Sequence, residues 1–519
     1  MKKILALLLA AVMVAGLFAG CTTGNGGSDT TTAPVDNSGD TTTAPVDNNG
    51  DTTTTTTPAT PSGEVVTLKW YQVGGGQPGN YDAWLAQINP SLEEKIGVNL
   101  DVQVVGWGDW GDRRSVIVST NEPYDIMFTN MDTYAADVAL GAFADLTDLL
   151  ENYPDLKNVL PAEYWDAVRI DGRIYGVPAY KDSSMTNYFV WDADVAAEYF
   201  PGYKDAHTLA DLTDGLKAIY EGTGTAPVGL NKDGISAVAG NKYDGLGAGL
   251  GTLGVSYTKG DNKVVCTFEQ EDVMNDLRTL HEWYVNGYIN QDAPNLDSAP
   301  TYKVVAVAQG WPYAAVTTWG PSLGASPFTG EAVNCEAIQW ENTVLSNDTV
   351  QGSMACISAS SAHPDKALEL LQLVNTDSYV RDMLYYGVQG ENWDYVDVNG
   401  EQRVHKNNTD WSMAGYTQGT FFNVTLDDTT EFNYWVEEVQ KLNESAIPSP
   451  ALGFSFDTSS VSEKLSACVA VYEKYKSVLL TGAMDPEEIV PQMMSEMRAN
   501  GFDDIVAEAQ AQLDAFLAG

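Results

Sequence analysis

Strand-like and helix-like hydrophobic patterns alternate along the first part of the globular sequence. Apolar residues recur at helical spacing in 81–95, and a second helical pattern, in 131–150, is broken at Gly141. Strand-like runs at 65–73, 97–105 and 124–130 precede and separate these helical segments. Strands that alternate with helices predict an α/β fold with a parallel sheet covered by helices on both faces.

The last third of the chain has helical patterns of its own. Residues 363–374 begin with a proline in the first turn, and residues 485–501 have an acidic start and a terminal glycine. Residues 502–519 form a final amphipathic pattern. The stretch from about residue 64 to 519 is too long for one ordinary core, so we expect two domains.

The N-terminus has the pattern of a secreted lipoprotein. Residues 1–20 carry two lysines and then a short apolar run, which predicts a signal peptide rather than a membrane span. The following Cys21 ends a segment, LFAGC, that resembles a bacterial lipobox, so we expect Cys21 to be lipidated. Residues 21–63 repeat Thr, Pro, Asp and Asn with almost nothing to bury, and we expect a disordered linker.

The charge of the chain limits the classes of partner that it can bind, and its cysteine content limits the metal sites and disulfides that it can form. The chain has 27 basic and 71 acidic residues, a net charge of −44, which makes nucleic acid and anionic surfaces unlikely partners. Cys266, Cys335, Cys356 and Cys468 have apolar neighbours and spacings that match no zinc motif. Buried free thiols are the favoured interpretation, and one or two disulfides remain an alternative.

The sequence offers no convincing catalytic motif. The four histidines form no H-E-x-x-H pair, G-x-S-x-G is absent, and the G-x-G-x-x-G at 249–254 does not follow a strand pattern. Nothing singles out a pair of carboxylates at the separation that a glycosidase needs. We therefore expect neither catalysis nor a cofactor nor a metal, and a surface hydrolase stays a lower-ranked alternative.

Three turns follow the predicted strands and precede predicted helices. They therefore lie at the carboxyl ends of the strands, which is the edge at which parallel sheets bind ligands. GGGQPGN contains Gln77, GWGDWGD contains Trp107, Asp109 and Trp110, and FTNMD contains Asn130. Indole faces stack on sugar rings, and the carboxylate and amide groups of these turns would form hydrogen bonds with the sugar hydroxyls. The alternatives are that an indole packs beneath its turn and that Asp109 caps the next helix.

The chain resembles a known family in the order of its short motifs. The series WGDW, STNEPYDIMFTN, GAFADLTDLL and DGRIYGVPAY, followed by HPDKALELLQLVNTDSYVRDMLYYGVQGENWDY, is similar to the extracellular solute-binding proteins of bacterial ABC importers. The C-terminal segment from residue 452 resembles the C-terminal domain of one lipoprotein branch. The resemblance covers essentially all of residues 64–519.

The resemblance implies a two-lobed, type II periplasmic-binding-protein-like fold with two or three crossings at a hinge. It places lobe one at about 64–178 plus 301–345, and lobe two at about 179–300 plus 346–519. The ligand would lie between the lobes, and closure would present the protein to a membrane permease. The implied location is the outer face of a bacterial cell membrane, in a Gram-positive organism.

Further aromatic and charged residues in turn-like contexts are candidates for ligand contact. They are Tyr180, Lys181, Trp311, Trp319 and Trp393. A site with several aromatic platforms favours a neutral oligosaccharide over an amino acid, which would need a charged clamp at both ends. A peptide-binding lipoprotein of the same fold is the main alternative, and a tethered adhesion module ranks last.

Overall fold

The structure is a computed structural model that describes residues 64–300, 302–312, 333–430 and 432–519. The predicted signal peptide, Cys21, the linker and Trp319 lie outside these residues. Within them, buried apolar side chains gather in two large cores. We call the residues around these cores the first lobe and the second lobe.

The first lobe is built on a five-stranded sheet. Its strand order is β2 (Val98–Gly106), β1 (Val66–Gly74), β3 (Ile126–Thr129), β13 (Met354–Ile357) and β6 (Gly176–Pro178). Strands β2, β1 and β3 are parallel, whereas β13 runs antiparallel to both of its neighbours. The predicted strands 65–73, 97–105 and 124–130 are confirmed as β1, β2 and β3.

Helices of the first lobe pack their apolar faces on this sheet. They are α2 (Tyr81–Ile96), α3 (Trp107–Thr120), α4 (Tyr134–Ala139), α5 (Pro154–Val159), α6 (Ala162–Ala167), α13 (Pro364–Thr376) and α14 (Ser378–Tyr386). The predicted helical face of α2 is confirmed for Trp84, Ile88 and Leu92, which are fully buried, while Leu85 is partly buried. Helix α4 ends before Gly141, whose positive φ stops it as the sequence predicted. Two short hairpins, β4 (Arg169–Ile170) with β5 (Arg173–Ile174) and β14 (Trp393–Val398) with β15 (Glu401–Lys406), complete this part.

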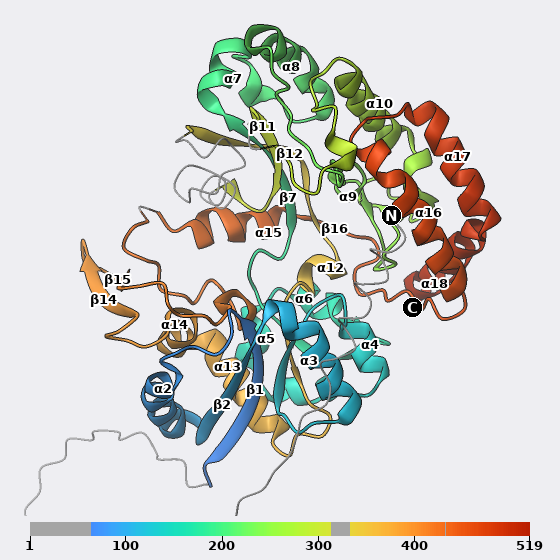
Figure 1. Cartoon of the computed structure of the whole chain (residues 1–519). Coiled ribbons are helices and arrows are strands. Elements are labelled where there is room, and N and C mark those ends of the chain that lie inside the picture. The colour runs from blue at the N-terminus through green and yellow to red at the C-terminus, as the bar shows by residue number, and fades with distance from the viewer. Residues whose placement is uncertain (1–63, 301, 313–332, 431) are drawn as a thin grey trace, which may run out of the picture. The chain divides into compact units, whose positions relative to one another are not determined.

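The second lobe contains a four-stranded and a three-stranded sheet. The first has the order β11 (Val305–Gln309), β7 (Met185–Asp192), β12 (Cys335–Leu345) and β16 (Ile447–Pro448), and the second has the order β10 (Val264–Cys266), β9 (Leu253–Ser256) and β8 (Tyr243–Asp244). Its helices are α7 (Ala193–Tyr199), α8 (Leu209–Thr223), α9 (Ala237–Gly240), α10 (Glu271–Val285), α16 (Ser462–Leu480), α17 (Pro486–Ala499) and α18 (Phe502–Ala518). The three C-terminal helices share the core of this lobe, with α16 and α17 beside α10 (Figure 1) and α18 against β10.

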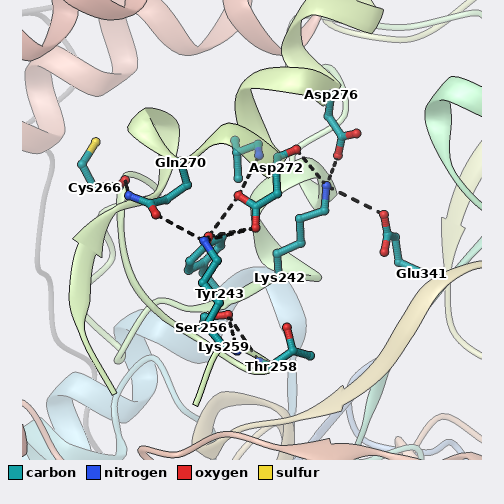
Figure 2. A network of polar contacts seen from close by, with 11 residues as sticks. Lys242, Tyr243, Ser256, Thr258, Lys259, Cys266, Gln270, Asp272, Asp276 and Glu341 are labelled. Carbon is teal, nitrogen blue, oxygen red and sulfur yellow. Dashed lines mark hydrogen bonds and ion pairs between the residues drawn. The ribbon is translucent and has the colours of Figure 1, made fainter. Parts of the chain in front are cut away.

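A network of charged side chains ties α10 to β12 within the second lobe (Figure 2). Lys242 bonds to the carboxylate of Asp276 and donates to the backbone carbonyl of Asp272 at 3.2 Å, and it lies 3.8 Å from Glu341. Tyr243 donates to the Asp272 carboxylate at 2.9 Å. Because each charge in the network has a partner of opposite sign, we assign it a structural role.

The lobe boundaries differ from those expected from the resemblance. Residues 301–345 were expected in lobe one, but β11 and β12 pair with β7 of the second lobe. Residues 346–519 were expected in lobe two, but β13, α13 and α14 belong to the first core. Pairing between strands that are distant in sequence leaves no local pattern, which is why the sequence misplaced these segments. The C-terminal helices lie in the second lobe as expected.

In the described part, the chain passes between the two cores three times. The crossings follow Tyr180, Trp340 and Val424, in agreement with the two or three that the resemblance implied. The four described cysteines are free thiols, so the disulfide alternative is not supported. None of the helices within the described ranges is long and apolar enough to cross a membrane.

A small cavity of about 90 Å³ lies at the second crossing, and residues of both cores line it. Asp348, in α12 (Asn347–Val350), and the buried Asp244 both face this cavity. Burial, together with the charges of Asp244 and Asp132, raises the pKa of Asp348 to about 6. The folded state therefore binds a proton here at a pH where the unfolded chain has released it.

We predict that Asp348→Asn stabilises the protein near pH 7.5 and has little effect near pH 4. Folding raises the pKa of this carboxyl, so ionisation is harder in the folded state than in the unfolded chain. The aspartate therefore lowers the free energy of unfolding as the pH rises from the pKa of the unfolded chain to that of the folded state, and asparagine does not. The free energy of unfolding at pH 7.5 should rise by about 1 kcal/mol, a value reduced to allow for the partial exposure of Asp348. Urea unfolding across this pH range measures it, with the exposed Asp155→Asn as the matched control. A gain that is equal at both pH values would contradict the prediction.

Candidate functional site

The parallel strands β1 and β2 bring two of the predicted turns to one edge of the first sheet. Gly74 pairs with Gly106, so both strands end at the same level (Figure 1). Strand β3, parallel to β1, ends at Thr129 on this edge as well. The sequence prediction that these turns meet is therefore confirmed by the strand register.

The two tryptophans of the second turn have different environments. Helix α3 begins at Trp107 itself, so Trp107 and Trp110 are three residues apart on one helical face. Both contact Phe128 of β3, Trp107 edge-on with ring centroids 5.6 Å apart and Trp110 at 5.7 Å. Trp110 is only 8% exposed, whereas Trp107 is 47% exposed. Trp110 is thus an anchor of the helix, and Trp107 presents its indole to solvent.

A second exposed aromatic ring lies against Trp107. The ring of Tyr416, 43% exposed, is nearly parallel to the indole, with an angle of 9° and centroids 6.3 Å apart. We call Trp107 and Tyr416 the aromatic platform. Tyr416 is not among the residues predicted from the sequence, because it comes from a segment far along the chain. Its only local signal of a turn is the flanking Gly415 and Gly419.

Backbone hydrogen bonds hold the Tyr416 segment on the end of β1. Ala414 donates to the carbonyl of Val73 at 2.9 Å, and Gly75 donates to the carbonyl of Ser412 at 2.7 Å. A Cβ atom at Gly74 would lie 2.0 Å from the Ser412 carbonyl oxygen. Glycine at position 74 is therefore required for this close approach.

A buried arginine fixes the rest of the segment. Arg381 of α14 is fully buried and donates to the carbonyls of Thr420 at 2.9 Å and Gly415 at 2.8 Å, with a longer bond to Gly419 at 3.3 Å. Burial lowers the pKa of Arg381 to about 10, so the guanidinium remains charged at neutral pH. Its five N–H donors suit a loop that presents several carbonyls in different directions.

The segment after the first crossing point lies near the platform. Lys181 forms an ion pair with Asp182 at 2.7 Å. Burial raises the pKa of Tyr416, and the nearby Asp182 carboxylate contributes to the rise. The backbone carbonyl of Lys181 accepts a bond from Asn443 at 2.6 Å. The Asp182 carboxylate is therefore close enough to act electrostatically on the exposed Tyr416 ring, and Lys181 is its ion-pair partner.

Tyr180 itself points into the lobe. Its ring is 7% exposed and packs edge-on against Tyr164 and Phe422. Burial raises the pKa of Tyr180 to about 12. These contacts describe a core residue that positions the neighbouring Lys181 and Asp182.

Three polar candidates have local roles. The Gln77 amide spans two backbone groups of the edge strand β2, donating to the Val102 carbonyl at 3.0 Å and accepting from the Val104 N–H at 2.8 Å. Asn130 donates to Asp132 at 2.8 Å, next to the end of β3. Asp109 is exposed in the first turn of α3 and makes no capping bond, because the helix begins at Trp107, three residues earlier than a cap at Asp109 would require.

The remaining tryptophan candidates are buried to different degrees. Trp311 is half-buried against Phe421 and Trp435, in an aromatic cluster distinct from the platform. Trp393 is fully buried and donates to the carbonyl of Gly387 at 2.9 Å. The prediction that Trp393 contacts a ligand is thus contradicted by its burial, because a polar turn sequence does not show which way its indole points.

The charged side chains of the described residues do not form a metal centre. No group of three or more His, Cys, Asp and Glu side chains within them is arranged to hold a metal ion. What the platform offers instead is an exposed apolar face with polar groups beside it. This combination suits stacking on a ring that carries hydroxyl groups.

We predict that Arg381→Met lowers the free energy of unfolding by about 3 kcal/mol, because several buried carbonyls lose their donor. Arg113→Met is the matched control. Arg113 is a partly exposed residue that pairs with Glu122 at 2.7 Å, and its loss should cost about 1 kcal/mol or less. Urea unfolding followed by circular dichroism compares the two. Equal losses would show that Arg381 is not the main support of the segment.

Comparison with known proteins places the chain in a family. Residues 87–423 match the model of the bacterial extracellular solute-binding protein family, and residues 450–518 match a domain of unknown function (DUF3502). A carbohydrate ABC transporter substrate-binding protein from Streptococcus pneumoniae is 31% identical over 471 residues, which cover 88% of this chain and 92% of that protein.

Two solved structures of an N-glycan transport solute binding protein from Streptococcus pneumoniae are also similar. The first is 29% identical with a TM-score of 0.75, and the match covers 87% of this chain and 99% of that one. The second, in complex with Man1GlcNAc, is 28% identical with a TM-score of 0.65 and covers 88% and 100%. The chain therefore belongs to the bacterial extracellular solute-binding proteins and has their two-lobed type II fold.

Proposed function

We propose that this protein captures an oligosaccharide outside the cell and delivers it to the membrane permease of an ABC importer. The observation that carries the proposal is the aromatic platform, in which Trp107 and Tyr416 expose parallel rings at the sheet edge where ligands of α/β proteins bind. The named carbohydrate and N-glycan functions of the similar proteins support the same class of solute.

The polar groups near the platform complete a plausible sugar site. Pyranose rings have apolar C–H faces for Trp107 and Tyr416 and hydroxyl groups at their edges. Asp182 and Lys181 can accept from and donate to such hydroxyls, and their mutual ion pair keeps the site close to neutral. This pattern suits a neutral part of the solute, held without covalent change, so the protein acts as a binding component and not as an enzyme.

The N-terminal sequence supports a location on the outer face of the membrane. In this proposal, signal peptidase removes residues 1–20, Cys21 carries the lipid, and residues 21–63 tether the lobes near the permease. A linker there would let a loaded protein meet a neighbouring permease. The organism would be Gram-positive, since such proteins need an anchor where no outer membrane retains them.

We predict that Trp107→Ala weakens oligosaccharide binding about thirtyfold, a loss of about 2 kcal/mol, because a central aromatic contact is removed. Isothermal titration calorimetry with Man1GlcNAc, maltotriose and a tripeptide measures it. Tyr416→Phe keeps the ring and should keep most of the affinity. Trp110→Phe is the matched control, since it alters a buried indole of the same helix.

The same titrations decide between solute classes. Sugar binding that is unchanged in Trp107→Ala would remove the platform from the site. Binding of the tripeptide alone would replace the oligosaccharide with a peptide as the solute.

We predict that Cys21→Ser releases the protein from the membrane into the medium when it is produced in a Gram-positive host. Only the cysteine sulfur can carry the lipid, and the rest of the chain is unchanged. Immunoblots of membrane and medium fractions measure the distribution, with Cys335→Ser as the matched control. Retention of Cys21→Ser in the membrane fraction would contradict lipid anchoring.

A further inference from the structure

Three cationic side chains are buried within the described part of the chain, and they differ in their partners. Arg381 and Arg403 each donate to backbone carbonyls, and Arg403 also pairs with Glu401 at 2.9 Å. Lys303 is 6% exposed, yet its ammonium group has no hydrogen-bond or ion-pair partner among the described residues. The Lys303 ammonium nitrogen is not among the fully buried atoms that lack a partner, so it reaches the space of the cavity that the residue lines. A charge with so little exposure and no protein partner is costly, so its presence needs an explanation.

Lys303 lines a cavity of about 330 Å³ in the second lobe. The cavity lies along the edge strand β11, which contributes Gln309, and beside β7, which contributes Asn187. The loop before α9 closes another side and contributes Ser236. Neither Trp107 nor Tyr416 lines this cavity, so it is separate from the aromatic platform.

Small residues give the cavity its space and guide the lysine stem. An added Cβ atom at Gly229 would lie 3.3 Å from the Lys303 Cβ and 3.5 Å from its Cε, so the stem runs along this glycine. Gly234, Ala299 and Ala306 form other parts of the wall. Among the described residues, these small side chains leave room on the wall that Lys303 lines.

The polar groups in the wall can recognise a hydroxylated ligand. Asn187 uses its amide N–H on Asn241, which leaves the amide oxygen available. Ser236 makes no capping bond at the start of α9, and Gln309 is exposed. Lys303 is the one charged side chain among the described wall residues. One ammonium group matches one carboxylate better than a phosphate, which carries more charge and usually needs several donors.

We propose that this cavity is a subsite for an acidic sugar unit, whose carboxylate pairs with Lys303 and whose hydroxyls bond to Asn187, Ser236 and Gln309. The volume is at the lower end of that of ligand pockets and suits one monosaccharide unit. The inference rests on the proposed function, because it assigns a carboxylate to the oligosaccharide that the importer takes up. The protein's net charge of −44 repels anions in general, so capture of an acidic unit depends on this local cation.

The test compares sugars that differ in a carboxylate. Purified full-length protein is titrated by ligand-observed NMR with glucuronate against glucose and galacturonate against galactose, and with N-acetylneuraminate. We expect at least one acid to bind at least tenfold more tightly than its neutral counterpart, and Lys303→Met to abolish that preference. Lys303→Met should also raise the temperature of unfolding without ligand. Methionine is similar in length to lysine, and it removes a charge that has no partner among the described residues.

Two results would overturn the subsite. They are equal binding of acidic and neutral sugars by the unaltered protein, and an acid preference that survives in Lys303→Met. If Lys303→Met does not fold, Lys303→Gln and the unaltered protein still provide the comparison. A parallel titration with Man1GlcNAc separates the two proposals, because binding that needs Trp107 but shows no acid preference retains the importer function and removes only the subsite.

Discussion

The aromatic platform depends on the buried guanidinium of Arg381. This one side chain gathers the carbonyls of Gly415, Gly419 and Thr420, and the segment that it holds carries Tyr416 to the end of β1. On the other side, Phe128 supports both Trp107 and Trp110 from β3. Two exposed rings can be parallel in solvent only because buried contacts fix each of them from below.

The two lobes contribute different chemistry to solute capture. The first lobe offers flat aromatic faces at a sheet edge, suited to neutral sugar rings. The second lobe offers a partly open cavity lined by Lys303, whose ammonium group has no partner among the described residues and which we propose takes a single acidic unit. Because the chain crosses between the cores three times, a movement of one lobe relative to the other would change the spacing of these two features.

Local patterns predicted the elements well and the long-range contacts poorly. Strands β1, β2 and β3 and the helical face of α2 followed from periodicity, and the turn that contains Trp107 was correctly placed at the end of β2. Tyr416 and Arg381 were missed because their roles arise from contacts with segments far away in sequence. Trp393 was misjudged for a related reason, since a polar turn can hide a fully buried indole. Lys303 could not be singled out from other lysines until its burial was known.

The most direct test of the central claim is a crystal structure of the protein with a bound oligosaccharide. We expect a pyranose ring stacked on the Trp107 indole, in contact with Tyr416 and with hydroxyls near Asp182. A sugar bound elsewhere, with Trp107 still exposed to solvent, would contradict it.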